Sequence, residues 1–333
     1  MKSPVIPSLQ NHTAPPIDVL DPHEALIFLH LTKTGGTSLF RLLKQHYAKP
    51  QTFHYGSKPG RTLQDFENLS LEQRAHLKFI HGHLEFGFHK RLDQSCRYIT
   101  LLREPISRVV SEYYFLHQNP RSPISKKYRL ASLRDFLSQN YLTVDNYQTR
   151  SIAGSLSNQF KFGECQTELL EAAKFNLAQF LWVGITDRFD ESLLLLKHQL
   201  GLKKILYSPF NQNSRKPQLN TIDECDIEYI RALNQLDLEL YQFGNELLSQ
   251  AIEQIGGSFR AEYHLFQHAN QHYRATTSAI KLEQKKQRKI RTKIRAIRQS
   301  RQQIVQMKKR IQNETNEISK SRLFRLLRRL GMG

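Results

Sequence analysis

Residues 25–47 read ALIFLHLTKTGGTSLFRLLKQHY, and this stretch decides the fold. The apolar run at 25–31 predicts a buried strand, and the leucines after the glycines recur at the spacing of a helix. Gly35 and Gly36 lie where the strand gives way to the helix. A strand, a glycine turn and a helix in this order are typical of a parallel α/β sheet.

Strand and helix patterns alternate along the rest of the chain. Residues 76–83, 96–102 and 179–185 contain short apolar runs and predict three more strands. Pro105 follows the strand at 96–102 and can occupy the first position of a helix, where proline is favoured. The alternation predicts a central parallel sheet covered by helices on both faces.

Capping residues predict the bounds of two later helices. Thr186 or Asp187 can begin one helix, which Gly201 would end. Thr221 and Glu224 can form a capping box for a long helix that runs to about residue 256.

Positive charge is concentrated near the C-terminus. The chain has 49 lysines and arginines, 30 acidic residues and a net charge of +19. Residues 281–333 hold 18 of the basic residues and three of the acidic ones, so the remainder is nearly balanced and a nucleic-acid-binding main domain is not favoured. We expect a flexible N-terminal arm, a catalytic domain and a basic helical extension, at residues 1–20, 21–257 and 258–333.

Two apolar patterns lie within the basic extension. Isoleucines recur every seven residues from Ile290 to Ile318, but Arg301 and Lys308 interrupt the second stripe and argue against a self-sufficient coiled coil. Residues 321–331, SRLFRLLRRLG, predict a basic amphipathic helix. We expect this extension to attach to an anionic membrane surface. The alternative is that it packs against its own domain or a second copy, as a homo-oligomer.

The sequence shows no pattern for secretion or membrane spanning. Its first twenty residues contain Pro, Asn and Asp where a signal peptide needs an apolar run, and no stretch approaches the ~18 apolar residues of a span. Three widely separated cysteines argue against a disulfide framework. We therefore expect a cytoplasmic protein, held at the inner membrane surface if the extension binds lipid.

The turn from Lys33 to Ser38 is suited to hold an anion. Its glycines let backbone amides approach phosphate oxygens, its hydroxyls can donate to them, and Lys33 adds a positive charge. In the P-loop of a nucleoside triphosphatase the lysine follows the last glycine, whereas Lys33 precedes both glycines. Taken alone, the motif is better explained as a tight turn with a solvated lysine.

A second anion-binding pattern follows the strand at 96–102. Arg103 comes directly after this strand, and Ser111 lies eight residues later on the expected helix. A guanidinium group can bind phosphate through two parallel hydrogen bonds, and a hydroxyl can contact a further oxygen. Two such turns in one sheet favour a nucleotide site over a pairing of Arg103 with Glu104 or a neighbouring acid.

These two motifs, LTKTGGTSL at 31–39 and LLREPISRVVSEYYF at 101–115, resemble the cofactor motifs of sulfotransferases that use 3′-phosphoadenosine 5′-phosphosulfate (PAPS). The resemblance is closest to the carbohydrate branch that includes heparan sulfate 2-O-sulfotransferases. It implies a P-loop-like α/β fold and a sulfuryl donor, PAPS, that needs no metal. It also implies a glycan or glycolipid acceptor.

The resemblance implies roles for individual residues. The 5′-phosphosulfate would be held by the loop of Lys33, Thr34, Gly35, Gly36, Thr37 and Ser38. The 3′-phosphate would be held by Arg103 and Ser111. Residues 210–217, FNQNSRKP, resemble a loop that closes on the nucleotide and add Ser214, Arg215 and Lys216.

Residues 79–89, FIHGHLEFGFH, supply candidates for proton transfer. A base that titrates near neutral pH suits the removal of a proton from the acceptor hydroxyl. The His-Gly-His segment resembles the one that carries the base in the 2-O-sulfotransferase-like family, which gives His83 this role with His81 in support. Glu85 is the competing base, because other branches use glutamate. A zinc site for the two histidines lacks further ligands at metal-site spacing.

Residues 145–154, DNYQTRSIAG, resemble a family segment that follows the 3′-phosphate helix. Asn146, Gln148 and Arg150 could line the acceptor cleft, or Asn146 could simply begin a helix. The function that we predict is sulfuryl transfer from PAPS to a carbohydrate hydroxyl, with His83 as base and Lys33 neutralising charge on the leaving oxygens. The alternatives are a P-loop-type kinase and a nucleic-acid- or membrane-binding protein that uses the basic extension.

Overall fold

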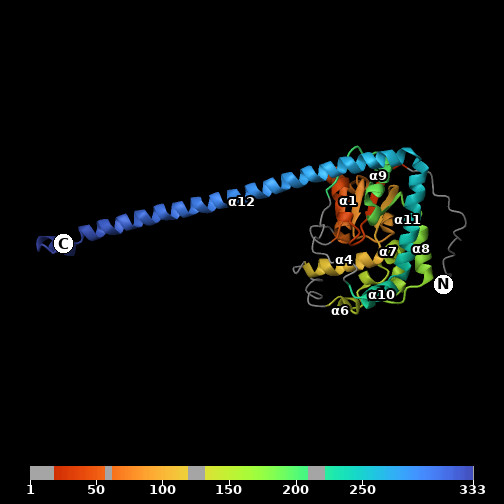
Figure 1. The fold of residues 1–333 in the computed structure, drawn as a ribbon, viewed down its shortest axis with the longest axis horizontal. Coiled ribbons are helices and arrows are strands. Elements are labelled where there is room, and N and C mark those ends of the chain that lie inside the picture. The colour runs from red at the N-terminus through yellow and green to blue at the C-terminus, as the bar shows by residue number, and fades with distance from the viewer. Residues whose placement is uncertain (1–18, 57–61, 119–131, 209–221, 333) are drawn as a thin grey trace. The chain divides into compact units, whose positions relative to one another are not determined.

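A computed structural model describes residues 19–56, 62–118, 132–208 and 222–332 (Figure 1). The chain forms two compact units, residues 1–271 and 272–333. The first unit contains the sheet. The second contains the later part of α12 (Ser258–Lys320) and α13 (Arg322–Arg329). The three-part division expected from composition remains a prediction.

Five parallel strands form the central sheet of the first unit, in the order β2-β3-β1-β4-β5. Their bounds are β1 (Ala25–Leu29), β2 (Thr52–Tyr55), β3 (Phe79–Gly82), β4 (Cys96–Leu102) and β5 (Trp182–Ile185). The sheet and its flanking helices confirm the predicted α/β class and the long C-terminal helix. Strand β2 was missed because it is a short edge strand in which Phe53 alone is fully buried.

Helices precede, follow and connect the strands (Figure 1). Within the first unit their bounds are α1 (Gly36–Leu43), α2 (Leu63–Glu67), α3 (Leu71–Ala75), α4 (Pro105–Gln118), α6 (Leu133–Leu137), α7 (Tyr147–Ala153), α8 (Thr167–Leu177), α9 (Phe189–Leu200), α10 (Glu224–Leu233) and α11 (Gln235–Ile255). Helix α4 begins at Pro105, as predicted from the preference of proline for the first turn.

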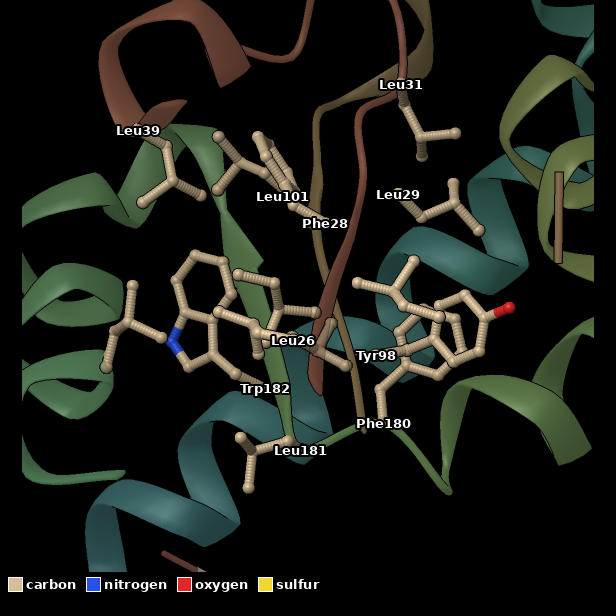
Figure 2. Packing of buried hydrophobic residues seen from close by; sticks show 14 of the residues in the cluster. Leu26, Phe28, Leu29, Leu31, Leu39, Tyr98, Leu101, Phe180, Leu181 and Trp182 are labelled. Carbon is tan, nitrogen blue, oxygen red and sulfur yellow. The ribbon is translucent and has the colours of Figure 1, made fainter. Parts of the chain in front are cut away.

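The core lies on both faces of the sheet. All five residues of β1 are buried, as expected for the central strand of a parallel sheet. Figure 2 shows Leu39 and Trp182 on one face, and Tyr98 and Phe180 on the other. The indole of Trp182 donates to the carbonyl of Ser192 in α9 at 2.8 Å, so its buried N–H is satisfied.

The start of α9 differs from the prediction. The helix begins at Phe189 with no side-chain cap, although Gly201 ends it in the left-handed conformation as expected. The hydroxyl of Thr186 lies instead against the carbonyls of Thr34 at 2.5 Å and Leu102 at 2.8 Å. Thr186 therefore ties the ends of β1 and β4 together rather than capping a helix.

The predicted long helix before residue 256 is two helices. Thr221 lies outside the described residues, and Asp223 caps α10 by accepting from the amide of Cys225 at 2.8 Å. The chain bends at Asn234, whose side chain donates to the carbonyl of Val144 at 2.8 Å. This tertiary hydrogen bond accounts for a break that helical periodicity does not reveal.

Candidate active site

Strands β1 and β4 end at the point where the connections of the sheet diverge. The chain leaves β1 toward β2 at one edge and leaves β4 toward β5 at the other. Ligands of open parallel α/β sheets bind beside the carboxyl ends of strands at such a point. The two predicted anion-binding turns meet here, because Arg103 Nη1 donates to the carbonyl of Lys33 at 2.9 Å.

The loop after β1 has an unusual backbone. Lys33 has a φ of 65°, which is uncommon for a residue with a side chain and is often found at functional sites. A Cβ at Gly36 would lie 2.1 Å from the ring of His30, so only glycine fits there. Helix α1 starts at Gly36 without a side-chain cap. Its N-terminal amides and helix dipole therefore favour an anion beside Lys33.

The hydroxyl groups of this loop differ in their surroundings. Thr34 is fully buried, and its Oγ1 donates to the carbonyl of Leu31 at 3.0 Å. That bond stabilises the loop and uses the proton of the hydroxyl, so the hydroxyl does not donate to a ligand in this arrangement. Thr37 and Ser38 lie partly exposed on the first turn of α1.

Lys33 lies in a half-buried and mainly cationic environment. Its Nζ is 3.9 Å from the centre of the Phe115 ring. Burial lowers the pKa of Lys33 to about 8; the carboxylate of Glu112 opposes this shift, and the charges of Arg103 and Arg108 add to it. Lys33 thus lies near two further cations and one carboxylate, while the charges of Asp187 and Glu104 also act on Arg103. An anionic ligand beside Lys33 would favour its charged form.

Arg103 is held through its backbone by α7. The side chain of Gln148 accepts from the amide of Arg103 at 3.0 Å and donates to its carbonyl at 2.9 Å. Glu104 does not form the pairing considered above, because its carboxylate accepts from the amides of Ile106 and Ser107 in the first turn of α4. The buried Nε of Arg103 has no partner among the described residues. Ser111 lies partly exposed on the same helix.

Asn146, Gln148 and Arg150 support the framework. All three are nearly fully buried. Asn146 precedes α7, and its Oδ1 accepts from the amide of Asp237 at 3.1 Å. Arg150 forms an ion pair with Asp145 at 2.5 Å. The structure thus favours the second of the two interpretations, in which Asn146 begins a helix.

His81 and His83 lie in contrasting environments at the end of β3. The ring of His81 stacks on those of Phe40 and His54, with ring centroids 3.9 Å and 4.4 Å apart, and burial lowers the pKa of His81 to about 3. His83 is exposed, and its Nδ1 lies 2.8 Å from the carbonyl oxygen of His30. A carbonyl only accepts, so Nδ1 donates in this bond, and in the neutral ring Nε2 then has the lone pair.

His30 is a site residue that the sequence interpretation missed. Its ring lies 4.9 Å from that of His83 and fills the space left by Gly36. Burial and the neighbouring His83 lower the pKa of His30 to about 3. The only indication in the sequence was that His30 lies near the end of the predicted strand, shortly before Lys33. Its contact with residue 83 depends on the pairing of β1 with β3.

A cavity of about 390 Å³ opens beside His83. Its lining includes Glu85, Tyr55, Lys90 and Arg91, so both candidate bases border the same space. Burial raises the pKa of Glu85 above its ordinary value. The volume falls within the range of small-molecule sites. Lys90 adds a positive charge to the lining and Glu85 an acidic group, while Arg91 is paired with Glu67 at 3.1 Å.

The remaining predicted features have no described geometry. Ser214, Arg215 and Lys216 lie outside the described residues. Within the described ranges, no group of three or more His, Cys, Asp or Glu residues is arranged to hold a metal ion. None of the helices in that part of the chain has both the length and the apolar content needed to cross a bilayer.

Comparison with known proteins identifies sulfotransferases. The family model described as galactose-3-O-sulfotransferase matches residues 4–324. The chain is 27% identical to heparan-sulfate 6-O-sulfotransferase 2 of Gallus gallus, covering 68% of this chain and 67% of the relative. It is 26% identical to heparan-sulfate 6-O-sulfotransferase 3 of Homo sapiens, over 68% and 58%. It is 26% identical to heparan-sulfate 6-O-sulfotransferase 2 of Danio rerio, over 82% and 65%.

The names of these relatives bear on the predicted likeness to the 2-O-sulfotransferase branch. The chain spans between 58% and 67% of their lengths. Their names specify 6-O transfer, so the predicted likeness to the 2-O branch is not confirmed.

Proposed function

The chain belongs to the galactose-3-O-sulfotransferase family, and from this premise we propose that it transfers the sulfuryl group of PAPS to a hydroxyl of a carbohydrate. The observation that carries the proposal is the position of His83. This residue hydrogen-bonds to the strand end that precedes the Lys33 loop, and it also borders a cavity large enough for a ligand.

The residues present fit the donor. The unpartnered Nε of Arg103 and the cationic surroundings of Lys33 suit a nucleotide with phosphates at two positions. The Lys33 loop with the first turn of α1 would hold the 5′-phosphosulfate in a P-loop-like manner, and Arg103 with Ser111 would hold the 3′-phosphate. When bound, the donor supplies a sulfuryl group with a phosphate leaving group.

Residues of the chain then accept the proton of the acceptor hydroxyl and neutralise the charge on the leaving phosphate. His83 Nε2 takes the proton of the acceptor hydroxyl as that oxygen forms its bond to sulfur and the bond from sulfur to the phosphate oxygen breaks. The electron pair leaves with the phosphate, and Lys33 neutralises the charge that develops there. His30 holds His83 in the tautomer that can accept. His81 remains neutral because burial lowers its pKa to about 3.

The acceptor that we favour is an anionic glycan. Lys90 and Arg91 border the cavity beside His83, and cations at such a position attract carboxylate or sulfate groups. The relatives whose names specify heparan sulfate agree with an acceptor of this class.

The experiment is a transfer assay with PAPS and a panel of glycans, read by the mass added to the acceptor. His83→Ala should lower turnover by ~10²–10⁴-fold while the affinity for desulfated nucleotide is kept. His76→Ala, at an exposed histidine of the same region, is the matched control and should retain activity. Full activity of His83→Ala together with loss in Glu85→Gln would transfer the role of base to Glu85. No transfer to any glycan by the unaltered chain would overturn the proposed function.

A further inference from the structure

The second unit presents a long, strongly basic helical surface. From 282 to 320 every residue of α12 is exposed, and residues 281–333 carry a net charge of +15. The described residues of this unit form only the later part of α12 and α13, so its apolar side chains have no core of their own. The surface therefore needs a partner that tolerates both charge and apolar contact.

The apolar side chains of α12 form one stripe. Ile290, Ile297, Ile304, Ile311 and Ile318 are between 55% and 67% exposed. Seven residues make almost two turns, so the stripe runs along one side of the helix with a drift of ~20° per repeat. Over 29 residues it is ~40 Å long.

Helix α13 repeats the same combination at the end of the chain. It carries Arg322, Arg325, Arg328 and Arg329. Leu326 is 59% exposed, and Leu330, just beyond the helix, is 65% exposed. Arginines around exposed leucines are typical of a helix that lies in the interface of a bilayer.

The charged residues in the row beside the stripe indicate which kind of partner can cover this surface. Arg301 and Lys308 continue the row that begins at Ile294, so a self-paired coiled coil would bury like charges in its seam. At a bilayer these long side chains can reach the lipid phosphates while their stems remain among apolar groups. A nucleic acid would use the cations but would leave the isoleucines in water.

We propose that residues 281–332 bind the surface of an anionic lipid bilayer, with the isoleucine stripe of α12 and Leu326 and Leu330 facing the acyl boundary. The cations on either side of the stripe attract acidic headgroups, and the apolar row adds contact that free phosphate cannot provide. This attachment is independent of the sulfotransferase activity. Of the bilayer, a nucleic acid and a second copy, the bilayer is favoured because it satisfies both features of the surface.

The test is cosedimentation of the full chain with vesicles of phosphatidylcholine, with and without phosphatidylserine. Binding should need phosphatidylserine and weaken as salt is raised. The double variant Ile297→Gln, Ile304→Gln should bind at least ~10-fold more weakly. Ala296→Gln, outside the stripe, should bind as the unaltered chain does. Circular dichroism and nucleotide affinity would verify that each variant is folded.

Three results would overturn the proposal. Equal sedimentation of the stripe variant would show that the isoleucines do not contact lipid. Absence of vesicle binding, with DNA retention that the isoleucine substitutions leave unchanged, would assign the surface to nucleic acid. Absence of vesicle binding, with a dimer in solution that the same substitutions dissociate, would assign the stripe to a second copy.

Discussion

The surroundings of Lys33 favour the loss of its positive charge and so lower its pKa. The burial of this lysine and the charges of Arg103 and Arg108 lower its pKa to about 8 from 10.5. The unfolded chain therefore binds more protons between these two pH values, and the contribution of this residue to stability rises with pH across that range. A bound anion has the opposite effect, since it favours the charged lysine and raises its pKa.

We therefore expect nucleotide binding to be coupled to protonation of Lys33. Above pH 8 the affinity for desulfated nucleotide should fall by up to ~10-fold per pH unit, because binding then takes up one proton. Calorimetry in two buffers of different ionisation enthalpy measures that uptake. Lys33→Arg stays charged and should lose this pH dependence. The same dependence in the arginine variant would assign it to another group.

The sequence predicts candidate anion-binding residues more readily than it predicts the residues that support them. Lys33 and Arg103 stand out because their types and their places after strands suit an anion. His30, Gln148 and Thr186 act through contacts with residues 53, 45 and 152 positions away, respectively. Such contacts depend on strand order and helix placement, which local patterns do not specify.

At the scale of elements, α11 holds the start of α7. The buried carboxylate of Asp237 accepts from the amides of Gln148 and Thr149 and from the Thr149 hydroxyl, at 3.1, 2.7 and 2.7 Å. It thus caps a helix to which it does not belong. Through Gln148, the same contact reaches the backbone of Arg103.

Removing this cap should destabilise the first unit. Asp237→Ala leaves two amides and a hydroxyl without their acceptor, and we expect a loss of at least ~1.5–3 kcal/mol in the free energy of unfolding. Glu239→Ala, on the same helix but exposed, should change stability by less than ~0.5 kcal/mol. Urea denaturation followed by circular dichroism gives both values. Equal midpoints for the two variants would contradict the capping role.

Elements were predictable where several local signals agreed. Strand β4 has the bounds 96–102 expected from its β-forming residues, and α4 begins at the expected proline. The break at Asn234 and the edge strand β2 were missed, because a tertiary hydrogen bond to Val144 fixes the first and pairing with β3 fixes the second.

At the scale of the whole molecule, the beginning of α12 belongs to the first unit. Phe259 and Phe266 are 4% and 7% exposed within its core. Asn270 accepts from the amide of Tyr207 at 2.9 Å. The composition change at residue 257 therefore precedes the end of the compact unit, which extends to Gln271.

Two truncations should behave differently. A chain that ends at residue 280 keeps these contacts, and we expect its free energy of unfolding to stay within ~0.5 kcal/mol of the full chain's. A chain that ends at residue 257 loses two buried phenylalanines and should be at least ~3 kcal/mol less stable. Urea denaturation of both chains, with nucleotide affinity as a check on folding, tests this. Equal stability would place the boundary at 257.

The hydrogen bond between His83 and His30 has a consequence for how acceptor preference can change. It links His83, the proposed base, to the end of the strand that also carries the Lys33 loop, whereas residues 84–91 form much of the neighbouring cavity wall. The wall begins directly after His83 in the chain, and this hydrogen bond holds His83 itself to the neighbouring strand. We expect grafts of residues 86–91 between relatives, with His83 and Glu85 kept, to change which glycan accepts the sulfuryl group while turnover still depends on His83, as a transfer assay with a glycan panel would measure.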